Sequence, residues 1–149
     1  MFTETLRNDH QEGDAQLAAA ESAVASGDWT AAAAAHATFA NAIEHHFCGE
    51  EQALFPALEA AMGEGFGPTR VMRSEHSQLR AMLQDLSQAI VARDDATYYA
   101  QADALRIMIR QHNLKEETIL YPMADRALAS QQDALLAAMK ACAAPTERT

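Results

Sequence analysis

The sequence predicts an all-α protein, an up-down-up-down four-helix bundle with a short C-terminal fifth helix. The chain is rich in Ala, Leu, Gln and Glu and poor in aromatic residues, Gly and Pro, a composition that favours helices over strands. Its apolar residues recur at alternating spacings of three and four, which is typical of the buried face of a helix. At 149 residues, the chain can bury a core as a single domain, residues 1–149.

The first two expected helices form a hairpin over residues 5–63. The first helix spans about residues 5–26 and stops at Gly27, a residue that commonly follows a helix end. Asp28 can cap the start of the second helix, which ends at Gly63.

The next two expected helices form a second hairpin over residues 67–126. The third helix opens at Gly67-Pro68, because Pro suits a first helical position. Asp94 can cap the fourth helix, which ends near Asp125. A shorter helix over residues 131–142 is expected to pack against the bundle.

The two hairpins are similar in sequence at a fixed offset of 66 positions. The stretch HFCGEEQALFP, residues 46–56, reappears as HNLKEETILYP at residues 112–122. The cap residue Asp28 likewise corresponds to Asp94. The prolines that end both stretches each remove a helical hydrogen bond, so we expect a local adjustment of the helix there.

Six positions on the predicted buried faces carry His or Glu instead of an apolar residue. Burial of such groups without partners costs several kcal/mol each, so they must satisfy one another or bind something. Reflection of each hairpin through its turn puts all six at one level near one end of the bundle. These residues are His10, His46, Glu50, His76, His112 and Glu116.

The spacing and chemistry of these six residues indicate a dinuclear metal site. Within each repeated stretch, the four-residue step from His to Glu puts both side chains on one helix face. Imidazole suits Fe, Zn, Cu or Mn, and two carboxylates can bridge two cations. Two metals, each with two His and sharing two Glu, form the simplest arrangement that satisfies the set, and bundle cores host such sites.

The repeated stretches, together with Asp9-His10 and Glu75-His76, resemble the hemerythrin-like, or HHE cation-binding, domain family over residues 5–126. The resemblance implies an up-down four-helix bundle with a non-haem di-iron centre. It implies two Fe ions joined by an oxo or hydroxo bridge, with Zn or Mn as less favoured alternatives. The implied metal ligands are His10, His46, Glu50, His76, His112 and Glu116.

Two departures separate the chain from the oxygen-carrying members that it resembles. Those members carry a second His one turn after the third-helix His, where this chain has Arg80, and they end with His-x4-Asp, where it has His112-x3-Glu116. We therefore expect a protein that binds or reacts with O₂ or NO in oxygen or redox sensing or in nitrosative stress. The alternative is iron storage, sensing or donation without turnover. A classical oxidase or peroxidase and a structural zinc bundle rank below both.

Three polar residues near the six receive separate expectations. His36 lies too far along its helix to share the site and is expected in the core. His45 is expected to contact another helix or to support a ligand. Asp14, one turn after His10, is either an extra ligand or an acceptor for an imidazole N–H, and we favour the acceptor role.

The sequence also predicts where the side chains of three residues in the repeated stretches lie. Glu51 and Glu117 follow the two proposed glutamate ligands directly and are expected to point outward. Tyr121 is expected to pack above the site, where its hydroxyl could reach a small bound ligand.

Charge and hydropathy argue against nucleic acid and membrane as partners. The net charge of −10 and the lack of a Lys/Arg cluster argue against nucleic acid, and the apolar runs are too short to span a membrane. No motif indicates a protein partner.

Cys48 and Cys142 form no CxxC pair, which predicts free thiols in a reducing compartment. With no basic and apolar signal segment visible, the sequence predicts a cytoplasmic protein.

Overall fold

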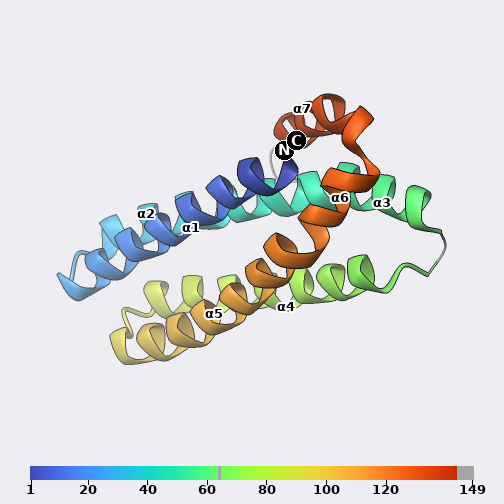
Figure 1. Ribbon diagram of the computed structural model, residues 1–149. Coiled ribbons are helices and arrows are strands. Elements are labelled where there is room, and N and C mark those ends of the chain that lie inside the picture. The colour runs from blue at the N-terminus through green and yellow to red at the C-terminus, as the bar shows by residue number, and fades with distance from the viewer. Residues whose placement is uncertain (64, 144–149) are drawn as a thin grey trace.

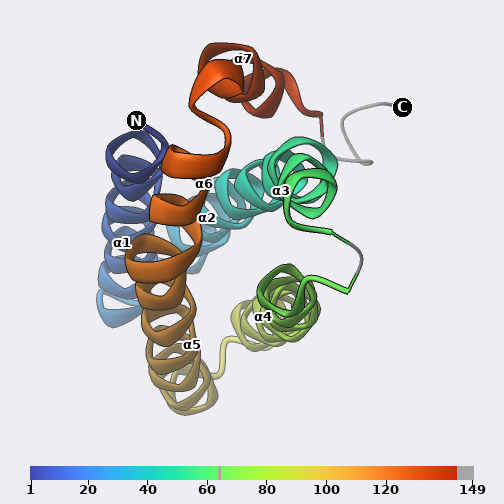
Figure 2. The same ribbon diagram turned by 45° about the vertical axis from the view of Figure 1, so that its right-hand side comes forward.

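The computed structural model describes residues 1–63 and 65–143, and every regular element in those ranges is a helix, which confirms the all-α class. The long helices are α1 (Phe2–Ala25), α2 (Trp29–Gly49), α4 (Gly67–Val91) and α5 (Asp95–Lys115). Helix α1 packs along α2 and α4 packs along α5, while α2 also contacts α4 and α1 contacts α5 (Figures 1 and 2). This arrangement is consistent with the expected four-helix bundle. Among the described residues, no helix has the length and hydropathy needed to cross a membrane.

The turn between α1 and α2 and the turn between α4 and α5 share one geometry. As predicted, the side chains of Asp28 and Asp94 each accept a hydrogen bond from a backbone N–H in the first turn of the following helix. Gly27 precedes the first cap with φ of 73°, and Arg93 precedes the second with φ of 54°. The left-handed conformation therefore recurs even where the repeat replaces glycine by arginine, because the turn requires it.

Both helices that carry the repeated stretch pass through a π-helical turn, and this confirms the adjustment expected near the prolines. The segments are η1 (Glu50–Leu54), followed by α3 (Phe55–Met62), and η2 (Glu116–Leu120), followed by α6 (Tyr121–Ala127). The N–H groups of Phe55 and Tyr121 bond to carbonyls five residues back. Since Pro56 and Pro122 lack an N–H and crowd the preceding turn, the wider turn accommodates each ring. It also begins at the two buried glutamates.

The apolar core consists of two clusters separated along the helices by the predicted His/Glu layer. One cluster lies toward the interhelix turns and includes Phe39, Leu86 and Leu105. The other includes Phe2 and Leu58 and extends under the C-terminal helices. Apolar side chains therefore lie on both sides of the polar layer along the bundle.

The C-terminal segment folds back over the bundle through η3 (Ala129–Gln131) and α7 (Gln132–Ala141). Helix α7 contacts α2 and η1 (Figure 1). The approach is close at Gly49, where a Cβ atom would lie 2.9 Å from the Cβ of Met139.

A disulfide joins Cys48 on α2 to Cys142 at the end of α7, with the two Cα atoms 6.0 Å apart. The prediction of free thiols is therefore wrong, and the cysteine-based argument for a reducing compartment no longer applies. The sequence could not show this pairing, because the cysteines are 94 residues apart and meet only through the path of α7.

We expect Cys142→Ser to lower the free energy of unfolding by about 2–4 kcal/mol, because the disulfide closes a long loop in the unfolded chain. Urea denaturation with and without dithiothreitol measures this effect. Reductant should bring the parent protein to the stability of the variant and leave the variant unchanged. An unchanged parent midpoint under full reduction would contradict the prediction.

Candidate metal centre

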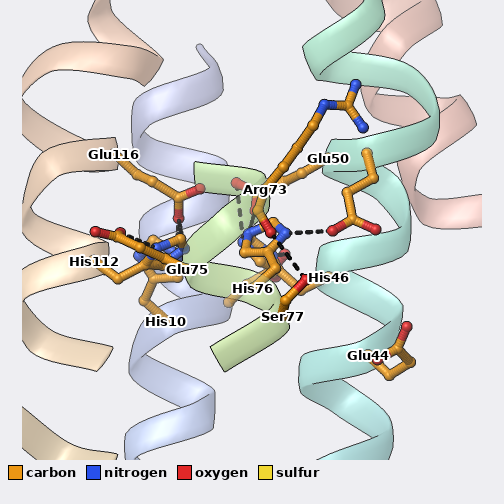
Figure 3. Close-up of polar contacts among 12 residues, drawn as sticks. His10, Glu44, His46, Glu50, Arg73, Glu75, His76, Ser77, His112 and Glu116 are labelled. Carbon is orange, nitrogen blue, oxygen red and sulfur yellow. Dashed lines mark hydrogen bonds and ion pairs between the residues drawn. The ribbon is translucent and has the colours of Figure 1, made fainter. Parts of the chain in front are cut away.

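The structure brings the six predicted His and Glu side chains together in one layer, which we call the His/Glu cage. They come from six different elements: His10 from α1, His46 from α2, Glu50 from η1, His76 from α4, His112 from α5 and Glu116 from η2. Figure 3 shows these side chains converging from the surrounding helices. Both glutamates and His76 are fully buried, and His112 is 1% exposed.

The two glutamates each lie between imidazoles of both hairpins. Glu50 Oε1 is 3.1 Å from His76 Nε2, and Glu50 Oε2 is 3.4 Å from His46 Nε2. Glu116 Oε1 is 3.2 Å from His10 Nε2 and 3.4 Å from His112 Nε2. The pattern is two-fold symmetric, as the 66-residue repeat predicts, and each carboxylate contacts one His of its own hairpin and one of the other.

Several buried atoms of the cage lack a hydrogen-bond partner. Among the described residues, Glu50 Oε1, Glu116 Oε2 and the Nε2 atoms of His76 and His112 form no hydrogen bond despite complete burial. Unsatisfied groups of this kind cost about 1–3 kcal/mol each and are rare in folded proteins. Acceptor oxygens and imidazole nitrogens that face one another in this way fit a cation between them.

Two groups within the cage have the spacing to hold a metal ion. One consists of Glu50, His76, His112 and Glu116, and the other of His10, His46 and Glu116, with the ligand atoms of each group within 4.8 Å of one another. Imidazole and carboxylate are donors that suit iron, zinc and manganese.

Each of the four imidazoles is held by an outer carboxylate at its other ring nitrogen. The Nδ1 atoms of His10 and His76 lie 2.8 and 2.7 Å from Glu117 and Glu51. Those of His46 and His112 lie 3.1 and 2.8 Å from Asp9 and Glu75, the residues that precede the two other histidines. A carboxylate only accepts, so Nδ1 carries the proton and Nε2 faces the cage centre.

The expectation that Glu51 and Glu117 point outward is therefore wrong. In a regular α-helix the residue after a buried ligand turns by 100°, away from the same face. Here the π-helical turns begin at Glu50 and Glu116, and the residue that follows each one reaches a histidine of the other hairpin. The doubled Glu-Glu in both repeated stretches was the sequence signal for this role.

Cationic side chains support the outer carboxylates in turn. Arg80 pairs with Glu51 at 3.0 Å and with Glu44 at 2.8 Å. Lys115 pairs with Glu75, and Arg7 lies 2.9 Å from Glu117. Partial burial alone would raise the pKa of Glu51, but its bonds to His76 and Arg80 lower it to about 2. The outer carboxylate thus stays ionised and available to the imidazole.

The carboxylates also dominate the protonation of the cage. Burial alone would lower the pKa of His112, but Glu116 and Glu50 raise it to about 9. Burial would likewise raise the pKa of Glu50, yet the charge of His46 and hydrogen bonds within the cage hold it well below the usual range. A metal ion entering the cage must displace protons from the imidazoles, so metal binding releases protons.

Tyr121 places a hydroxyl group inside the cage, a role that the sequence indicated only in part. Its oxygen lies 2.6 Å from Glu50 Oε2 and 2.9 Å from Glu116 Oε1. It is also 3.2 and 3.1 Å from the Nε2 atoms of His10 and His46. Burial and the two carboxylates raise the pKa of Tyr121 well above its usual range, so the hydroxyl remains a proton donor.

The remaining candidates lie apart from the cage. As expected, His36 is buried in the core. Its Nε2 atom is 3.1 Å from the Leu83 carbonyl. His45 contacts another helix through the carbonyl of Lys140 at 2.9 Å. The predicted acceptor role of Asp14 is wrong, because Glu117 takes that place at His10, and within the described residues Asp14 bonds to no imidazole.

A comparison with protein families gives one match. The model of the family described as Hemerythrin HHE cation binding domain matches residues 1–124, which include the whole cage. No curated protein and no solved structure matches the chain. The match confirms the resemblance carried by the repeated stretches.

We expect Glu51→Gln to weaken Fe²⁺ or Zn²⁺ binding by roughly 10–100-fold, because His76 loses the carboxylate that orients it. Titration of the purified chain with either ion, followed by calorimetry, measures the affinity. Glu59→Gln is the matched control, since Glu59 pairs with Arg73 and Thr69 and, among residues 1–63 and 65–143, with no imidazole. Equal losses in both variants would show that the outer carboxylate has no specific role.

Proposed function

The chain belongs to the hemerythrin HHE cation-binding domain family, and we propose that its cage holds two iron ions that bind or react with O₂ or NO. A role in oxygen or redox sensing, or in the response to nitrosative stress, follows from this chemistry. The observation that supports the proposal most directly is the set of buried Glu oxygens and His nitrogens that face one another and, within the described residues, lack a hydrogen-bond partner. A metal ion held between these atoms would satisfy them and offset the cost of their burial.

We assign His10 and His46 to one ion and His76 and His112 to the other. Glu50 and Glu116 would serve both ions, since each glutamate contacts imidazoles of both pairs. The donors would also accept Zn or Mn. We favour iron because of the family to which the chain belongs.

The two proposed metal positions differ in their surroundings. On one side, the Phe47 ring stacks on His76 with centroids 3.7 Å apart, and Phe55 lies on the same imidazole at 5.6 Å. His10 and His46 instead have the Tyr121 hydroxyl beside them. When bound, ferrous iron supplies a centre that binds O₂ or NO or is oxidised by O₂. We propose that small ligands arrive on the His10 and His46 side, where the protonated Tyr121 hydroxyl can donate a hydrogen bond.

The position of Arg80 supports a role other than reversible oxygen carriage. The oxygen carriers that the chain resembles have an additional histidine there, whereas the guanidinium of Arg80 is bound to Glu44 and Glu51. Its charge is thus directed to Glu51, the carboxylate bound to His76, and to Glu44, and not to the cage. Storage or donation of iron is the alternative function. The outer carboxylates on all four imidazoles favour firm retention of the ions over ready release.

We expect His112→Ala to lower iron affinity by more than about tenfold, because it removes a donor and leaves a buried carboxylate unpaired. The metal content of the dialysed, iron-loaded protein measures this loss. His36→Ala is the control, since His36 is buried in the same bundle but lies apart from the cage, with its Nε2 atom bonded to the Leu83 carbonyl. Circular dichroism verifies that both variants are folded. Similar iron loss in both would overturn the assignment of His112.

The proposed function itself is tested by the optical spectrum of the reduced, iron-loaded protein exposed to O₂ or NO and then degassed. We expect new bands after exposure, and with O₂ a change that degassing does not reverse. Iron that leaves the protein on exposure, or that is lost readily to a chelator, would favour the storage or donation alternative. The absence of any iron-dependent band would contradict the di-iron proposal.

A further inference from the structure

A pocket of about 550 Å³ lies between α1, α2 and α7 and reaches the His/Glu cage. Its inner end is formed by His10 and His46, the pair that we assign to the less covered metal position. Pockets of roughly 300–1,000 Å³ hold small organic molecules, so this space is far larger than a diatomic ligand requires.

The internal repeat explains how space for a pocket arises beside His10 and His46. Phe47 packs on His76, whereas the equivalent position in the second hairpin is Asn113, which lines the pocket. The buried Leu79 of the second hairpin corresponds to Gly13, where a Cβ atom would have no neighbour within 4 Å. Two large apolar side chains that fill one half of the bundle are thus replaced by smaller ones in the other half.

The walls of the pocket are largely apolar and one of them is fixed in place. Ile43 and Phe47 of α2 line the pocket together with Leu136 and Met139 of α7. Helix α7 is held there by the disulfide at its end and by its close contact with Gly49. A preformed apolar space of this type favours ligands with an apolar body.

The charged residues around the pocket have mostly one sign. Asp9, Glu12 and Asp14 of α1 line it, and Lys140 of α7 is the opposing cation among its lining residues. The side chain of Asp9 is half-exposed and bonded to His46, while Glu12 and Asp14 are exposed. The rim therefore attracts an organic cation and repels a carboxylate of similar size.

We propose that this pocket binds a mostly apolar organic amine, with its hydrocarbon body between α2 and α7 and its ammonium group near the carboxylates of α1. Such a ligand would lie beside His10 and His46. Any reaction or sensing at the metal rests on the proposed function, whereas binding to the pocket does not. The protein would then respond to an organic molecule as well as to a diatomic gas.

Binding of octylamine to the full chain, with and without iron, tests this inference by calorimetry or ligand-observed NMR. Octanoate is the matched anionic probe, and we expect it to bind at least about tenfold more weakly. We expect Gly13→Leu, which introduces the residue of the other hairpin, to weaken octylamine binding by more than about tenfold because leucine fills the pocket. Leucine also suits a helix better than glycine, so folding should be preserved.

Ala18→Leu provides the control for Gly13→Leu, since residue 18 is exposed on the same helix and does not line the pocket. It should bind octylamine like the parent protein. Equal binding of amine and carboxylate, unchanged binding in Gly13→Leu, or no octylamine binding at all would overturn the proposal. Measured iron content separates the two hypotheses. Octylamine binding without iron binding supports the pocket and contradicts the di-iron site, and the reverse result does the opposite.

Discussion

The structure depends on the burial of two glutamates, Glu50 and Glu116, at the centre of a helical bundle. A carboxylate without partners in such a place would cost far more than a domain of this size can tolerate. Four imidazoles meet the two carboxylates, and four outer carboxylates hold the imidazoles in turn. The π-helical turns begin at these same glutamates, and the apolar core is divided on either side of them. Local backbone geometry and core packing are thus both arranged around one polar layer.

The repeat makes the cage symmetric but leaves its surroundings unequal. The donors of the two hairpins match residue for residue, whereas the residues that cover them do not. Phe47 and Phe55 lie on His76, and their counterparts Asn113 and Tyr121 bring polar groups to the other half. A pair of similar metal positions can therefore have different reactivity without any difference in donor type, since access and hydrogen bonding distinguish them.

The segment after the repeat adds a second level of asymmetry. Helix α7 has no equivalent in the first hairpin, and it packs over α2 at Gly49 and forms one wall of the pocket. The disulfide fixes this helix beside the cage, since Cys48 lies between His46 and Glu50 in the chain. The bundle and its cage thus follow from the repeat, whereas the pocket requires the non-repeated C-terminal helix.

The helical class, the caps at Asp28 and Asp94 and the convergence of six polar residues were determined by the sequence alone. They depend on periodicity and on a repeat, which operate within a helix or between helices of known order. The outer partners Glu51 and Glu117, the Cys48–Cys142 disulfide and the hydroxyl of Tyr121 within the cage were decided only by the tertiary structure. A π-helical turn changes the direction of each following side chain, and the path of α7 brings together residues far apart in the chain. The π-helical turns recur with the repeat, but which histidine the redirected side chain reaches depends on the packing of the two hairpins, and the path of α7 has no counterpart in any sequence spacing.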